Sequence, residues 1–209
     1  MPHKASPALL AMILAACQDN VATPFPPGLE PLEENPVEQP TGEELLTQAK
    51  DTDYIHVYGR GLVVSAPAQL WALAKLPSAM YARCSTDERT VMENNDSMYE
   101  SSFLVHYVVN DILTVEWDDQ WRYGTIEGTP DAPRLGMIRH QKVQGSDFIS
   151  LSEGTVQIIA TDDPEVSELA FVERLDALSG STGDVVQGMQ DNYNRLRALA
   201  HGEPEPACP

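Results

Sequence analysis

The stretch VSAPAQLW, residues 64–71, marks a change from strand to helix, and the fold assignment depends on it. Residues 54–64 are rich in β-branched and aromatic side chains, which favours a strand. Pro67 suits the first turn of a helix, because the N–H that proline lacks would have no partner there. Apolar side chains then recur at helical spacing. The sequence therefore predicts a strand followed by two short helices, at residues 68–75 and 78–83.

A series of strands is predicted to follow the two short helices. The β-rich segments are residues 86–93, 102–109, 112–117, 136–143, 148–159 and 167–178. Asn110-Asp111 is a plausible tight hairpin connection, and residues 144–147 form a second candidate turn. Consecutive strands joined by short turns indicate an antiparallel sheet.

Residues 182–201 form the clearest predicted helix. Thr182 is a candidate cap at its start, and Gly202 ends it. Apolar residues recur at intervals of three and four and make a stripe along one side. The stripe must cover an apolar surface, and the sheet is the obvious partner.

This order of elements, together with the junction at residues 64–71, resembles the START-like or SRPBCC superfamily, which includes the birch-pollen allergen, polyketide cyclases and lipid-transfer domains. The junction is similar to the family's apolar-x-Ala-Pro-x-x-aliphatic-Trp pattern. The likeness covers about residues 54–201, and outside the junction it rests on element order alone. It implies an α+β helix-grip fold over residues 51–202, a curved antiparallel sheet wrapped around the C-terminal helix, with residues 203–209 as a flexible tail.

The resemblance also implies a cavity between sheet and helix that binds an apolar small molecule or lipid. The candidate lining residues are Val185, Met189, Tyr193 and Leu196 on the helix and Tyr107, Trp117 and Trp121 on strands. Such a stripe can equally be plain core, since some members of the fold have filled cavities. Two other functions therefore stay open: an envelope structural or protein-interaction role, with an unknown partner, and a cyclase or hydrolase activity.

Residues 1–17, MPHKASPALLAMILAAC, have the layout of a secretory signal, because Lys4 precedes an apolar run too short to span a bilayer. The sequence LAAC at residues 14–17 resembles the lipobox of bacterial lipoproteins, in which the signal is removed before a cysteine that is then acylated. The resemblance implies a signal peptide at residues 1–16 and a lipid anchor on Cys17. Gln18 at the next position points to the outer membrane of a bacterial envelope. A plain secretory signal, or an uncleaved anchor, is the alternative.

Residues 17–50 are predicted to be a linker between the anchor and the domain. Residues 18–40 are rich in Pro and Glu, which disfavours a helix or a central strand and favours a semi-rigid spacer. The sequence TGEE at residues 41–44 has the spacing of a capping box, so a short helix is expected to begin there.

The formal charge of −19 argues against a nucleic-acid partner, which would need clustered Lys and Arg. It equally disfavours docking onto an anionic membrane through basic residues. The excess is spread over linker and domain, which suits a domain held at the membrane without lying on it.

No motif for a metal, a cofactor or catalysis is present in the sequence. The histidines are isolated, and Glu116 and Asp118, which share one strand face, more plausibly face solvent than a cavity. Cys84 and Cys208 are a possible disulfide in an oxidising compartment, with two free thiols as the alternative.

Overall fold

The computed structural model describes residues 20–80, 84, 86–110 and 113–207. The elements are β1 (Leu45–Asp51), β2 (Ile55–Val63), α1 (Pro67–Ala74), α2 (Pro77–Met80), β3 (Glu88–Glu93), β4 (Ser101–Asn110), β5 (Thr114–Thr129), β6 (Ala132–Gly145), β7 (Ile149–Ala160), β8 (Ser167–Ala177) and α3 (Thr182–His201).

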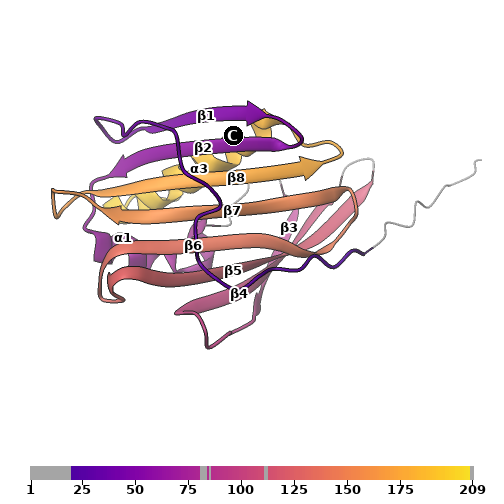
Figure 1. Ribbon diagram of the computed structural model, residues 1–209, viewed down its shortest axis with the longest axis horizontal. Coiled ribbons are helices and arrows are strands. Elements are labelled where there is room, and N and C mark those ends of the chain that lie inside the picture. Colours follow the sequence, from indigo (N-terminus) through magenta and orange to yellow (C-terminus); the bar gives the residue numbers. More distant parts are fainter. Residues whose placement is uncertain (1–19, 81–83, 85, 111–112, 208–209) are drawn as a thin grey trace, which may run out of the picture.

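The eight strands form one antiparallel sheet in the order β1-β2-β8-β7-β6-β5-β4-β3 (Figure 1). Strands β3 to β8 are consecutive hairpins, and the pairing of β2 with β8 joins the first two strands to that run. Helix α3 lies behind the sheet in Figure 1 and packs on β1, β2 and β8, with α1 and α2 beside it. The predicted α+β helix-grip fold is confirmed.

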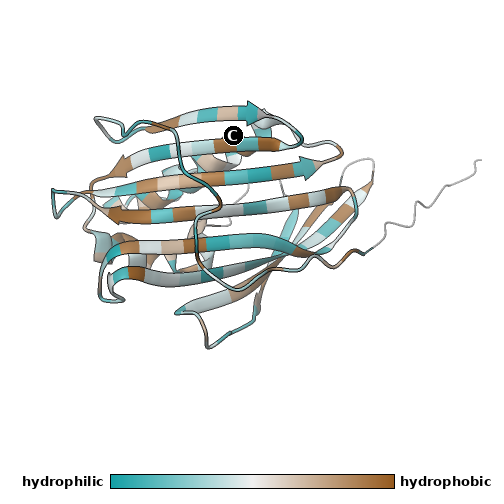
Figure 2. Cartoon of the chain, viewed as in Figure 1, coloured by the Kyte–Doolittle hydropathy of each residue, from teal (hydrophilic) through white to brown (hydrophobic). Residues whose placement is uncertain are grey.

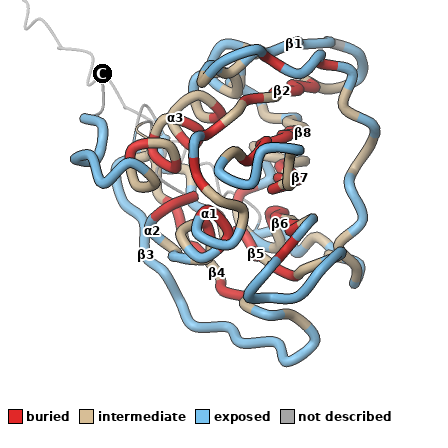
Figure 3. The backbone as a smooth tube through the Cα atoms, turned by 90° about the vertical axis from the view of Figure 1, so that its left-hand side faces the viewer, coloured by how far each residue is buried: buried red, intermediate tan, exposed pale blue. Residues whose placement is uncertain are grey.

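The core lies between the concave face of the sheet and the helices. Figure 3 shows buried residues concentrated where the strands and helices face one another. Aromatic residues predominate among the largest buried side chains and include Trp71, Trp121, Tyr107, Tyr123, Tyr193 and Phe171. This face carries nearly all the apolar burial that stabilises the domain.

Two glycines of β2 allow α3 to approach the sheet closely. A methyl group on Gly61 would lie 2.6 Å from Cε2 of the Tyr193 ring, and Gly59 faces Met189 in the same way. The Tyr193 hydroxyl donates a hydrogen bond of 2.7 Å to the carbonyl of Leu62. Burial raises the pKa of Tyr193 to about 12. Contact between α3 and β2 is therefore both tight and specific.

The caps of α3 differ in one position from the expectation. Ser181, not Thr182, is the N-cap residue, and its side chain forms a capping box with Asp184. Gly202 ends the helix in the left-handed conformation, with φ of 66°.

The prediction of a short helix after Thr41 is wrong, because these residues lead into the edge strand β1. Leu45 pairs with Gly61 and also packs against the core. Pairing satisfies backbone groups along β2 that would otherwise form an open edge, and this outweighs a weak helical preference. Glu43 of the expected capping box instead accepts a hydrogen bond of 2.5 Å from the backbone N–H of Val64.

Strand β5 is also much longer than the predicted segment at 112–117. The strand continues to Thr129 through the polar residues Asp118, Asp119 and Gln120, which do not have the composition of a typical strand. The turn that joins it to β6 at Ala132 was missed for the same reason.

Residues 20–43, expected to be part of a spacer, lie along the convex face of the sheet and are called the N-terminal strap below. In Figure 1 the strap crosses in front of the central strands. Asn20 forms an isolated bridge with Ser146, and the backbone N–H of Val21 donates to the carbonyl of Gly145 at 2.8 Å. Further along, the Asn35 side chain donates to the carbonyls of Gly59 and Phe171.

The convex face suits a polar, proline-rich segment. Figure 2 shows hydrophilic residues interleaved along its strands. Glu33 of the strap contacts Nδ1 of His56 at 2.9 Å and Nε of Arg174 at 3.0 Å. The Arg122 guanidinium lies 3.8 Å from the ring centroid of Phe25 and donates to the carbonyl of Pro26. Ion pairs, cation–π contact and backbone hydrogen bonds thus hold the strap, together with a small apolar cluster in which Val37 and Leu32 of the strap pack with Tyr58 and Val172.

The variant Gly61→Ala should lower the free energy of unfolding by about 1–3 kcal/mol, because the new methyl group overlaps the Tyr193 ring. Urea unfolding measures the change. Gly188→Ala on α3 is the matched control: its methyl group meets open space, so stability should stay equal or rise by up to ~1 kcal/mol. Equal losses in both variants would contradict the close approach of α3 to β2.

The variant Glu33→Gln should weaken strap attachment in a pH-dependent way. Partial burial acts to raise the pKa of Glu33, but hydrogen bonds from His56 and Arg174 outweigh it and lower the pKa below the ordinary carboxyl value. A carboxyl with a lowered folded-state pKa stabilises the protein above its unfolded pKa, and that stabilisation is lost as the pH falls through the folded value. We expect a loss of about 1–2 kcal/mol at pH 7 that shrinks below about pH 4.

Urea unfolding of the wild-type chain and the variant across this pH range measures the difference. Glu34→Gln, at the exposed neighbouring position, should change stability by less than about 0.5 kcal/mol at every pH. A Glu33→Gln effect that is independent of pH would show that the charge does not hold the strap.

Candidate ligand-binding cavity

The larger cavity, called the mouth cavity below, opens at one end of the sheet. Its volume is about 490 Å³, and it lies where the β4–β5 and β6–β7 connections, the end of β8 and the start of α3 meet. Its lining is mainly apolar and includes Leu113, Val115, Trp117, Phe148, Leu175 and Leu178. The volume and lining are those of a small-molecule site.

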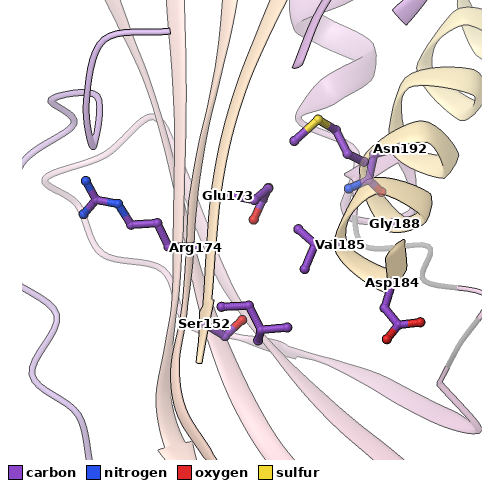
Figure 4. Close-up of a pocket in the computed structure, with 9 residues that line it drawn as sticks. Ser152, Glu173, Arg174, Asp184, Val185, Gly188 and Asn192 are labelled. Carbon is purple, nitrogen blue, oxygen red and sulfur yellow. The ribbon is translucent and has the colours of Figure 1, made fainter. Parts of the chain in front are cut away.

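A smaller space of about 90 Å³, called the inner chamber below, lies between β7, β8 and α3 (Figure 4). Ser152, Leu175 and Asp184 line both spaces, so the two adjoin. In Figure 4, Glu173 points from the sheet toward α3, where Asn192 and Val185 face it, while Arg174 points to the opposite side of the sheet. The cavity system therefore changes from an apolar mouth to a polar inner end.

The polar inner end is built around a buried pair. Nε2 of His140 lies 3.1 Å from Oε1 of Glu173, and the His140 ring, only 1% exposed, stacks on Trp121 with centroids 4.2 Å apart. Gly154 makes room for the pair, because a methyl group there would overlap both side chains. The strand alternation that puts Trp121 in the core thus also puts His140 beside it on the next strand.

One polar atom that lines the inner chamber, Oδ1 of Asn192, is buried without a hydrogen-bond partner among the described residues. Buried polar atoms are normally hydrogen-bonded, because leaving one unsatisfied costs roughly 1–3 kcal/mol. The inner chamber can therefore receive a hydrogen-bonding group.

A second buried polar group supports the rim of the mouth. Lys142 donates hydrogen bonds to the carbonyls of Ser146 and Ile149, and thereby holds the β6–β7 turn. Burial lowers the pKa of Lys142, although the negative charges of Asp119 and Asp147 act in the opposite direction. Asp119 is fully buried and pairs in register with Lys142 across β5 and β6. This lysine has a structural position and does not line either cavity.

Six of the seven predicted lining residues belong to the same core cluster between sheet and helices, and Val185 packs against that cluster, but only some of the seven reach a cavity. Trp117 lines the mouth, and Val185 and Met189 line the inner chamber. The other four are core residues that line neither space: Tyr107, Trp121, Tyr193 and Leu196. Sequence reasoning missed Glu173 and His140, because nothing in one sequence shows which face of a strand a polar residue takes. It missed Asn192 on α3 because the apolar stripe alone was used to choose the inward residues of the helix.

The remaining predicted sites have other roles. Asp118 contacts His106 at 2.7 Å, away from the mouth cavity and the inner chamber. Cys84 is disulfide-bonded, and Cys17 and Cys208 lie outside the described residues. Within residues 20–80, 84, 86–110 and 113–207, no three His, Cys, Asp or Glu side chains gather closely enough to hold a metal ion. In the same part of the chain, no helix has the length and apolar character to cross a membrane.

Comparison with known proteins identifies the fold. No family model matches the sequence, and no curated protein sequence matches it. Among solved structures, human StAR-related lipid transfer protein 5 is similar with a TM-score of 0.56 at 10% identity, over 79% of this chain and 85% of that one. The human StarD13 (DLC2) lipid transfer and protein localization domain gives a TM-score of 0.53 at 13% identity, covering 78% and 87%. A START superfamily protein from Mycobacterium smegmatis gives 0.51 at 10% identity, covering 70% and 97%. At such identities the likeness shows a START-like fold alone.

A double-mutant cycle tests the buried pair. Glu173→Ala should lower the free energy of unfolding by about 1–3 kcal/mol, because it leaves Nε2 of His140 buried without its partner. Glu173→Ala combined with His140→Phe should cost less than the sum of the single changes by at least about 0.5 kcal/mol. Urea unfolding measures all three variants, and Glu165→Ala in the exposed β7–β8 turn is the control. Strict additivity would mean that the pair does not interact.

Proposed function

We propose that the protein is a membrane-tethered lipoprotein whose helix-grip domain binds an apolar small molecule or lipid between the sheet and α3. The observation that carries the proposal is the mouth cavity of about 490 Å³ with its mainly apolar lining. Burial of each ligand methylene there contributes about 0.8 kcal/mol. A ligand with six buried methylenes would gain roughly 5 kcal/mol before the costs of association.

The inner chamber favours a ligand with one polar end. Glu173 and the carbonyl oxygen of the Asn192 side chain are hydrogen-bond acceptors, and Asp184 adds a second carboxylate nearby. These groups accept from a hydroxyl, amide or amine and repel a carboxylate or phosphate. The ligand class that fits is therefore a neutral or cationic amphiphile with its polar end innermost.

The tether in this proposal is the lipid on Cys17, which the lipobox-like sequence at residues 14–17 supports. An acylated cysteine would place the domain on a membrane of the bacterial envelope, with the outer membrane favoured by Gln18. Two of the similar solved structures are named for lipid transfer, which agrees with a lipid as the cargo.

A second candidate function is an enzyme of the cyclase or hydrolase type. One observation favours it: Glu173, which lines the inner chamber, is paired with His140, and a histidine paired with a carboxylate is an arrangement that can transfer protons. Binding of a ligand requires only the apolar lining of the mouth cavity and the hydrogen-bond acceptors of the inner chamber. A reaction would in addition require that a substrate atom be held beside His140. Ligand binding is therefore the first proposal.

Binding of Nile red, a neutral apolar dye, to the chain carrying Cys17→Ser tests ligand binding by fluorescence titration. Ser152 lines both spaces, so Ser152→Trp should fill the passage between them and weaken dye binding at least about ten-fold. Asp162→Trp in the exposed β7–β8 turn is the control and should leave the affinity unchanged. Circular dichroism checks that both variants fold.

Mass spectrometry of an organic extract of the same purified protein identifies any co-purified amphiphile. Equal dye affinities for a folded Ser152→Trp chain and the control, together with an empty extract, would count against binding in the cavity. The protein-interaction role would then be the better account.

A further inference from the structure

The N-terminal strap begins beside the mouth cavity. Asn20 bridges to Ser146 in the β6–β7 turn, and the side chain of Ser146 accepts a hydrogen bond from the backbone N–H of Phe148, a lining residue of the mouth. Figure 1 shows the start of the strap at the end of the sheet where β8 finishes and the β6–β7 turn lies. Asn20, the first described residue, therefore lies at the mouth of the cavity and not at the opposite end of the sheet.

The distance from this point to the expected lipid anchor is short. Only Gln18 and Asp19 separate Asn20 from Cys17. Three Cα–Cα steps of about 3.8 Å reach at most ~11 Å. The strap cannot act as a spacer, because its hydrogen bonds to β6 and its ion pairs with β2 and β8 hold it against the domain.

The rim of the mouth exposes large apolar side chains. Leu178 is 80% exposed and Leu113 is 43% exposed. The two sit on different connections at the same end, and the backbone N–H of Leu178 donates to the carbonyl of Phe148 at 2.8 Å, which joins the end of β8 to the β6–β7 turn. Exposed leucines grouped around an apolar opening are typical of a surface that contacts something apolar.

The exposed charges beside the rim are acidic. Asp147 lies in the β6–β7 turn, Asp176 near the end of β8 and Asp184 in the first turn of α3. Carboxylates at these positions repel an anionic lipid surface and tolerate a zwitterionic one. The matching partner is thus a zwitterionic bilayer surface.

We propose that the rim of the mouth cavity docks on the bilayer that holds the Cys17 anchor, so that the cavity opens toward the lipids. This inference rests on the proposed tether. It differs from the expectation of a domain that stands away from the membrane, because the strap shortens the tether to two residues. Leu113 and Leu178 enter the interface, and a lipid passes between bilayer and cavity without crossing water.

A photo-crosslinking residue, p-benzoylphenylalanine, tests the orientation in the full acylated chain reconstituted in phosphatidylcholine vesicles. At position 178 it should crosslink to lipid at least about five-fold more than at position 76. Leu76 is a matched control, since it is an exposed leucine, at 47%, in the connection that follows α1. Figure 1 shows α1 at the end of the sheet opposite to the one where β8 finishes. Equal yields at the two positions in an acylated chain would overturn the docking proposal.

Two further arms separate the possible failures. Replacing one third of the phosphatidylcholine by phosphatidylglycerol should lower crosslinking at position 178, and a rise would overturn the choice of a zwitterionic surface.

Mass spectrometry must find the acyl groups on Cys17, and Cys17→Ser should remove them and release the chain from membranes. A chain without acyl groups overturns both tether and docking, whereas dye binding by the Cys17→Ser chain tests the cavity independently of either.

Discussion

The ring of Tyr193 lies against the backbone of β2 because Gly61 carries no side chain, and one turn earlier Met189 lies against Gly59 in the same way. These contacts fix the middle of α3 on the sheet, at Met189 and Tyr193. The first turn is not held so closely, because Val185 is only partly buried. The mouth cavity adjoins that first turn, and the inner chamber extends along the helix as far as Met189 and Asn192. The place where α3 approaches β2 closely therefore sets the inner limit of the space in which the domain can hold a ligand.

The two faces of the sheet are covered by different kinds of contact. The concave face buries aromatic side chains, and its charged groups are paired or have carbonyl partners, as His140 with Glu173 and Lys142 with the β6–β7 turn illustrate. The convex face is covered by an acidic, proline-rich strap, which binds through Arg122 and Arg174. These two arginines are thus engaged within the molecule, and the chain as a whole remains strongly acidic, with a formal charge of −19.

The fold could be predicted because it depends on features that a single sequence displays. The junction at residues 64–71 and the apolar stripe of α3 are periodic and local, and the strand order follows from short turns. Strand β1 and the strap could not be predicted, because both are held by partners far away in the chain: Leu45 pairs with Gly61, and Asn35 contacts Phe171. The polar end of the cavity could not be predicted for a related reason. In the sequence Glu173 cannot be distinguished from a surface glutamate until the register of β8 is known.

Asn35 binds carbonyls of Gly59 and Phe171, and the second of these lies 136 positions further along the chain. Its binding site is complete only after β8 has paired with β2. Such non-local pairing forms slowly compared with local contacts. We therefore expect the strap to dock on the sheet only after β2 and β8 have paired. Before that step, residues 20–43 would leave the convex face uncovered.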